Sequence, residues 1–186
     1  MARQWYPLLE LQFRKCHGIA FQDFVGNFFG ALYPDDFIRV TAHGKLGDGG
    51  MDGFRQSDGT LYQCYGARNG HVQDVRHVCD KLKDDFETAR LKTLQMKRWL
   101  FTNNLIDLPR PLVDAFLELQ PVAESCGIEA RLCGIDTFKA LLSELDEEKL
   151  EDLIGVAVYA RVEGLAISDE TGLTNCTIFS CGVIYR

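Results

Sequence analysis

Two short segments between residues 47 and 65 carry side chains of the types that can bind hard metal ions. Asp52 lies among glycines in segment 47–54 (GDGGMDGF), and Gln63 lies in the apolar segment 61–65 (LYQCY). The Asp-Gly pair in segment 56–60 predicts a hairpin turn between them, so we expect the two side chains on neighbouring strands. Magnesium prefers oxygen ligands and usually takes only one or two carboxylates from a protein. Asp52 and Gln63, with the main-chain carbonyl of Cys64, therefore predict a Mg²⁺ (or Mn²⁺) site.

A metal at such a position suits phosphodiester hydrolysis, because it lowers the pKa of a bound water and neutralises charge on the phosphate. A nearby basic group would stabilise the negative charge that develops during the reaction.

Each of these residues also has a purely structural interpretation, which the sequence leaves open. Asp48 and Asp52 can simply form the turn, since Asp and Gly dominate such loops. Gln63 alternates with apolar neighbours and can be an interior amide whose hydrogen bonds are satisfied by the fold. Lys81 and Lys83 can belong to a solvated helix face.

The elements that would position these residues follow from apolar periodicity and turn signals. Apolar positions at spacings of three and four predict a helix from Ile19 to the Tyr33-Pro34 stop. Together with this helix, the segments that follow give the order α-β-β-β-α-β-α-β-α, which predicts a mixed α/β fold. Expected strands are 37–42, 51–54, 61–65, 98–103 and 128–133, and expected later helices are 71–95, 112–125 and 137–154.

The predicted domain covers residues 1–154. Residues 155–186 do not continue the alternation of strands and helices, although segments 156–159 and 177–179 have strand-like composition. We interpret this part as a C-terminal extension or the start of a further domain.

Segments 18–25, 47–54 and 61–65 together resemble the PD-(D/E)XK superfamily, and most closely its Mrr-like branch, in which a GxDG strand is followed by a Gln-x-Lys strand. The resemblance implies a restriction-endonuclease-like α-β-β-β-α-β core over residues 8–103, with a mixed central sheet flanked by helices. It places the metal ligands at Asp52, Gln63 and, in the preceding helix, Asp23. Tyr65 stands at the lysine position of the motif, but a phenol, with an ordinary pKa near 10, is a poor substitute for a cation. Members of the superfamily sometimes carry this lysine on a neighbouring helix, so Lys81 is the preferred candidate for the basic group. The candidate catalytic residues are therefore Asp52, Gln63, Tyr65 and Lys81.

The resemblance also implies a function. It predicts a metal-dependent nuclease domain that cleaves DNA, as an effector of a bacterial anti-phage defence or restriction system. We expect substrate contacts from Lys45, Asp48 and Lys83, and either a homodimer or assembly with partner defence subunits. The alternative is a catalytically inactive module of the same fold that binds nucleic acid or partner subunits, which Tyr65 favours. An unrelated α/β binding module remains if the hairpin match is coincidental.

Composition sets the outer limits of these interpretations. The chain has 186 residues and a net charge of −7, with 46% apolar and 25% charged residues, which is typical of a folded globular domain. Residues 71–110 hold eight basic and six acidic residues, whereas residues 111–186 hold five and fourteen, so only the middle of the chain is suited to a phosphate backbone.

Targeting and cysteine signals point to one compartment. No apolar run reaches about 18 residues, so no membrane span is expected, and no secretory signal is recognised. The seven cysteines show no CxxC spacing and predict neither a zinc site nor a disulfide framework. We therefore expect a cytoplasmic protein.

Overall fold

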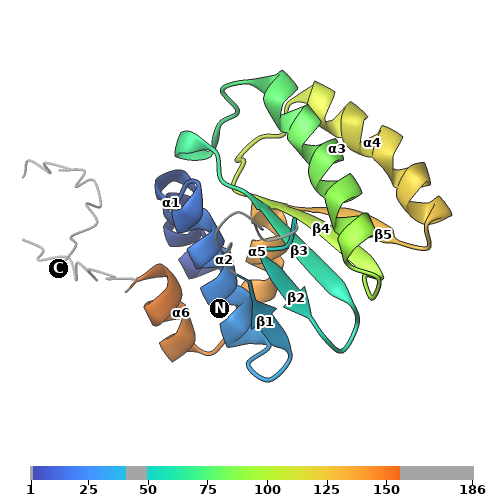
Figure 1. Cartoon of the computed structure of the whole chain (residues 1–186). Coiled ribbons are helices and arrows are strands. Elements are labelled where there is room, and N and C mark those ends of the chain that lie inside the picture. The colour runs from blue at the N-terminus through green and yellow to red at the C-terminus, as the bar shows by residue number, and fades with distance from the viewer. Residues whose placement is uncertain (1, 41–49, 156–186) are drawn as a thin grey trace, which may run out of the picture.

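A five-stranded mixed sheet lies between two layers of helices (Figure 1). The structure is a computed structural model that describes residues 2–40 and 50–155. The strands stand in the order β1-β2-β3-β4-β5; β1, β2 and β3 are antiparallel, and β3, β4 and β5 are parallel. The strands are β1 (Phe37–Arg39), β2 (Gly53–Arg55), β3 (Thr60–Tyr65), β4 (Arg98–Asn103) and β5 (Glu129–Cys133). The predicted α/β class with a mixed, helix-flanked sheet is confirmed.

The hairpin expected between Asp52 and Gln63 is present. Strands β2 and β3 pair in antiparallel register with Gly53 opposite Tyr62. In the turn, Asp58 accepts a hydrogen bond from the Thr60 backbone N–H at 3.1 Å, as Asp commonly does in such turns. Gly59 has a φ of +68°, and a Cβ there would lie 2.7 Å from the carbonyl oxygen of Gln95. The turn therefore requires glycine for both its backbone angle and its close packing.

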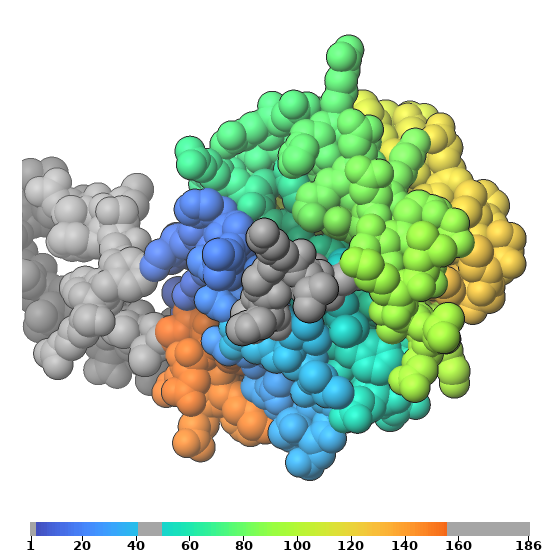
Figure 2. All heavy atoms as spheres, in the orientation of Figure 1, coloured from blue at the N-terminus to red at the C-terminus, as the bar shows by residue number. Residues whose placement is uncertain are grey.

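The helices divide between the two faces of the sheet. One face is covered by α1, α2, α5 and α6, and the other by α3 and α4 (Figure 1). Figure 2 shows the same division in the filled molecule, with α1 and α2 in blue on one side and α3 and α4 in green and yellow on the other. The helices are α1 (Tyr6–Lys15), α2 (Ile19–Leu32), α3 (Val75–Lys92), α4 (Arg110–Ser125), α5 (Ile135–Leu141) and α6 (Glu147–Ile154).

Each face of the sheet buries its own hydrophobic core. Side chains alternate along a strand, so Tyr62 and Cys64 of β3 belong to the first core, and Leu61 belongs to the second. The first core is rich in phenylalanine, and four of these side chains, Phe21, Phe24, Phe28 and Phe29, come from α2. The second core is built around Trp99 and Phe101 of β4, which pack against α3 and α4.

The helix expected from Ile19 to Tyr33 is confirmed as α2, and it is preceded by a separate helix, α1, which the sequence did not predict; Gly18, with a φ of +53°, lies between the two. Two later helices differ from the sequence expectations. Helix α3 begins at Val75, where Asp74 caps it by accepting from the His77 backbone N–H at 3.1 Å. The last expected helix is divided into α5 and α6, since Asp146 caps a new start through the Lys149 N–H. In each case a local cap or turn overrides a continuous apolar period.

Several expectations concern residues that the structure does not describe. The strand-like segments 156–159 and 177–179, and the end of the strand expected at 37–42, lie outside the described residues. Among residues 2–40 and 50–155, no helix has the length and apolar character needed to span a bilayer.

Candidate functional site

Asp52 is held between β1 and β3 by hydrogen bonds on three sides. Its backbone N–H donates to the Tyr62 carbonyl at 2.9 Å, and its carbonyl accepts from the Val40 N–H at 3.0 Å. Its carboxylate oxygen Oδ2 accepts from the Cys64 N–H at 2.6 Å. Asp52 is thus bonded to both chain neighbours of Gln63, which places the two candidate ligands side by side. Asp52 is 8% exposed, so it is a buried residue and not a solvated turn residue.

Gln63 is buried, and its amide oxygen Oε1 has no hydrogen-bond partner among the described residues. By strand alternation Gln63 lies on the same face of β3 as Leu61, toward α3. Leaving a buried polar atom unpaired costs about 1–3 kcal/mol, so native folds rarely do so without a reason. The fold therefore leaves this oxygen without the partner that an ordinary interior amide requires.

Lys81 and Asp85 lie one turn apart on α3 and form an ion pair, with 2.7 Å between Lys81 Nζ and Asp85 Oδ2. The pair is partly buried, with 31% of the lysine and 17% of the aspartate side chain exposed. A Cβ on Gly50 would lie 3.3 Å from the Asp85 carbonyl oxygen, so the chain leading into Asp52 packs directly on this part of α3. Asp85 was not among the sequence candidates, although its i, i+4 spacing from Lys81 was a usable signal.

The pKa of the buried Cys64 thiol depends on the charges around it. Burial raises its pKa well above the ordinary value, and the charge of Asp52 raises it further, whereas the charge of Lys81 lowers it. Asp52 and Lys81 of α3 therefore both act electrostatically on the same buried sulfur of β3.

Tyr65 occupies a different environment. Its ring stacks on Phe101, with centroids 6.0 Å apart and planes 19° apart. It lines a cavity of about 340 Å³ together with His17 and His77. Burial and the charge of Asp74 raise the pKa of the phenol, so Tyr65 is neutral at physiological pH. It cannot supply the positive charge that the lysine of the motif would bring.

The other predicted site residues are engaged elsewhere or lie outside the description. Asp23 is exposed on α2 and pairs with Arg39 of β1. Lys83 points to α4, where it pairs with Glu118 at 3.1 Å, and half of its side chain is exposed. Lys45 and Asp48 fall within residues 41–49, which are not described. The hairpin thus brings Asp52 next to Gln63, whereas Lys81 pairs with Asp85 on α3, and Asp23 and Lys83 have other partners.

The donor set at this position is composed of oxygens. Within residues 2–40 and 50–155, no three His, Cys, Asp or Glu side chains gather as metal ligands. The available donors are the Asp52 carboxylate and the unpaired Gln63 amide oxygen, both buried. Magnesium keeps several of its waters and binds through one or two carboxylates, so this small set of hard donors fits Mg²⁺ or Mn²⁺.

Comparison of the chain with family models, curated proteins and solved structures finds no match. The geometry of the site is therefore the basis for the functional argument.

Proposed function

We propose that the chain is a metal-dependent nuclease domain that cleaves DNA phosphodiesters, with Mg²⁺ or Mn²⁺ held by Asp52 and Gln63. The observation that carries this proposal is the unpaired, buried Oε1 of Gln63 next to the buried Asp52 carboxylate. A fold that leaves this oxygen unsatisfied gains from a cation that accepts its lone pair. The resemblance of the hairpin to the Mrr-like branch suggests a role as an effector in bacterial anti-phage defence or restriction.

The order of elements supports the same fold family. Helix α2, strands β1, β2 and β3, helix α3 and strand β4 follow each other as α-β-β-β-α-β, with an antiparallel β1-β2-β3 unit and β4 parallel to β3. In this arrangement the chain that leads into β2 packs against α3 at Gly50. The order of elements is the one that the resemblance to restriction-endonuclease-like proteins implies.

The residues of the site divide the work between them. A bound divalent cation would supply a water of lowered pKa and neutralise charge on the phosphate. Asp52 provides the anionic ligand, and its bond from the Cys64 N–H fixes the direction of the carboxylate. Lys81 offers an ammonium that stabilises negative charge on the phosphate, which is the role of the missing lysine of β3. Asp85 holds that ammonium in place from one helical turn away.

The second candidate function is a catalytically inactive module that binds nucleic acid or partner subunits. Two observations favour it: Tyr65 is neutral, and Lys81 is already paired with Asp85 at 2.7 Å. If this ion pair does not open toward a phosphate, no cation assists cleavage.

Cleavage of DNA by the purified chain distinguishes the two functions. We expect nicking or degradation of plasmid DNA with Mg²⁺ or Mn²⁺ and none in excess EDTA. Lys81→Met is expected to lower the rate about a hundredfold, because it removes the cation while keeping the length of the side chain. Lys83→Met is the matched control, since Lys83 lies on the same helix but pairs with α4, and we expect it to stay within about threefold of the native rate.

The outcomes separate the two functions clearly. Retention of DNA binding without cleavage under either metal would favour the inactive module. Equal losses of cleavage rate in the two lysine variants would show that Lys81 has no specific role in the site and contributes only positive charge.

Gln63→Met is expected to stabilise the metal-free protein by about 1–2 kcal/mol, because methionine fills a similar volume without a buried unpaired oxygen. The measurement is urea denaturation in EDTA, with Gln120→Met on α4 as a control for the change of residue type. We also expect Mg²⁺ to raise the melting temperature of the native chain but not of Gln63→Met, since a ligand stabilises only the state that binds it. A loss of stability above 1 kcal/mol in EDTA would show that the fold itself satisfies this amide.

A further inference from the structure

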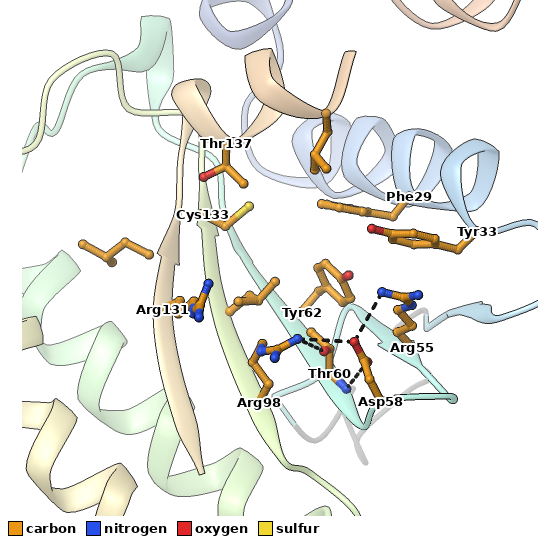
Figure 3. Close-up of a pocket in the computed structure, with 13 residues that line it drawn as sticks. Phe29, Tyr33, Arg55, Asp58, Thr60, Tyr62, Arg98, Arg131, Cys133 and Thr137 are labelled. Carbon is orange, nitrogen blue, oxygen red and sulfur yellow. Dashed lines mark hydrogen bonds and ion pairs between the residues drawn. The ribbon is translucent and has the colours of Figure 1, made fainter. Parts of the chain in front are cut away.

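A second cavity, of about 240 Å³, lies on the opposite face of the sheet from α3 and α4. Its walls combine aromatic rings with three arginines, one from each of three strands (Figure 3). Arg55 comes from β2, Arg98 from β4 and Arg131 from β5. None of these residues belongs to the candidate nuclease site.

The register of the sheet explains why the three arginines meet. Arg55 of β2 stands opposite Thr60 of β3, and Thr60 stands opposite Arg98 of β4. Residues opposite each other on paired strands point to the same face, so these side chains form one row across the sheet. Arg131 lies in the next row, opposite Leu100. Three guanidinium groups are thereby collected on one face, although they are far apart in the sequence.

Carboxylates occupy only part of the donor capacity of Arg55 and Arg98. Arg55 donates through Nε to Asp36 at 2.8 Å and through Nη1 to Asp58 at 3.3 Å. Arg98 donates through Nε to Glu129 at 2.7 Å and through Nη1 to Asp58 at 3.3 Å. Figure 3 shows both arginines reaching the shared Asp58. Among the described residues, neither Nη2 group has a polar partner.

The wall of the cavity is more positive than the ion-pair network as a whole. Arg131 pairs with Glu129 through Nε and Nη2, and its Nη1 has no partner among the described residues. Asp36 and Glu129 bind the arginines from outside the lining, and Asp58 is the carboxylate of the lining itself. Three guanidinium groups and one carboxylate therefore line the space, while Asp36 and Glu129 make the ion-pair network as a whole neutral.

Neutral donors and rings complete the walls. Tyr33 lies under the guanidinium of Arg55, with 3.9 Å from the Arg55 carbon Cζ to the ring centroid. Burial raises the pKa of the Tyr62 phenol far above its ordinary value, and burial also raises that of Tyr33. Both phenols therefore keep their protons and act as donors. Phe29 adds an apolar surface next to them (Figure 3).

We propose that this cavity binds the phosphoryl group of a small phosphate ester or of a phosphorylated strand end. Guanidinium groups recognise phosphate oxygens with directed, charge-assisted hydrogen bonds, and three arginines that each keep an unused donor line this cavity from three strands. Sites for drug-sized ligands span about 300–1,000 Å³, so this smaller space suits a phosphate with one attached sugar or ring and not a large ligand. The inference is independent of the proposed nuclease function.

Arg131→Gln tests the proposal with little risk to folding, because 64% of this side chain is exposed and Glu129 is its only ion-pair partner among the described residues. Titration calorimetry in low-chloride buffer with EDTA would use three probes: inorganic phosphate, adenosine 5′-monophosphate, and one oligonucleotide with or without a 5′-phosphate. We expect the native chain to bind a phosphorylated probe, and Arg131→Gln to bind it about tenfold more weakly. Arg110→Gln, at an 84% exposed position on α4, is the matched control and keeps the native affinity.

The probes identify the source of the phosphate. Binding of the mononucleotide supports a small ester, and binding of only the 5′-phosphorylated oligonucleotide supports a strand end. Absence of binding to every probe, or equal affinities of the native chain and Arg131→Gln, overturns the proposal. Asp52→Asn is expected to leave this binding unchanged, so failure of the nuclease proposal and failure of this one can be told apart.

Discussion

Replacing Asp52 with asparagine is expected to lower the rate of metal-dependent DNA cleavage by about three orders of magnitude, which corresponds to ~4 kcal/mol of transition-state stabilisation. The amide keeps an oxygen that can accept the 2.6 Å hydrogen bond from the Cys64 N–H, so the hairpin geometry is retained. What is lost is the negative charge that a divalent cation requires at this position. Initial rates of plasmid cleavage over a range of Mg²⁺ and Mn²⁺ concentrations measure the effect.

The control for this variant is Asp35→Asn, which makes the same chemical change at an exposed position before β1. We expect it to cleave at the native rate, and we expect both variants to melt within a few degrees of the native chain. A native rate in Asp52→Asn would exclude the proposed metal site. A loss of activity accompanied by a large drop in melting temperature would instead reflect folding, and Mg²⁺-dependent stabilisation of the native chain would then decide whether the site binds metal.

The parts of this fold that sequence patterns predict well are those with strong local signals. Strand β4 covers Arg98–Asn103 as expected, because a buried strand reads as a short apolar run between polar ends. The turn before β3 follows from Asp58 and Gly59, which have few alternatives to a tight turn. Helix starts were harder to predict, since the caps at Asp74 and Asp146 compete with an unbroken apolar period.

The candidate site was predictable only as far as local pairing reaches. A hairpin brings Asp52 next to Gln63 whatever the rest of the chain does, so these two could be named together. The missing partner of Gln63 Oε1 and the close approach of Gly50 to Asp85 depend on how α3 packs on the sheet, so they could not be predicted from the sequence. The Lys81–Asp85 pair, in contrast, follows from its i, i+4 spacing on one helix.

The cavity lined by three arginines was even less predictable from the sequence. Arg55, Arg98 and Arg131 become neighbours through the order β2-β3-β4-β5, and their spacing along the chain shows no pattern. Charge counts by segment also hide the cavity, because its carboxylate partners cancel its charge in any total. The lining itself holds more arginines than carboxylates, because the carboxylates bind the arginines mainly from outside the lining.

Phe138→Ala is expected to lower the free energy of unfolding by about 3–5 kcal/mol, a large share of the ~5–15 kcal/mol typical of a domain. Phe138 of α5 is fully buried, and its ring centroid lies 4.7 Å from that of Phe28 and 5.1 Å from that of Phe13. It joins α5 to both α1 and α2, so alanine leaves a cavity that rigid aromatic neighbours cannot fill.

Urea denaturation measures this loss, with Leu117→Ala as the control because that α4 side chain is 55% exposed and should cost under 1 kcal/mol. Phe138 lies in the helix layer opposite α3, so the variant should still cleave DNA at low temperature, where it remains folded. A loss below 1.5 kcal/mol would mean that α5 adds little to the stability of the sheet. Loss of cleavage in a folded Phe138→Ala protein would instead mean that the two helix layers are coupled through the sheet. Strand β3 offers a route for this coupling, because Tyr62 and Cys64 face the first core while Gln63 between them faces α3.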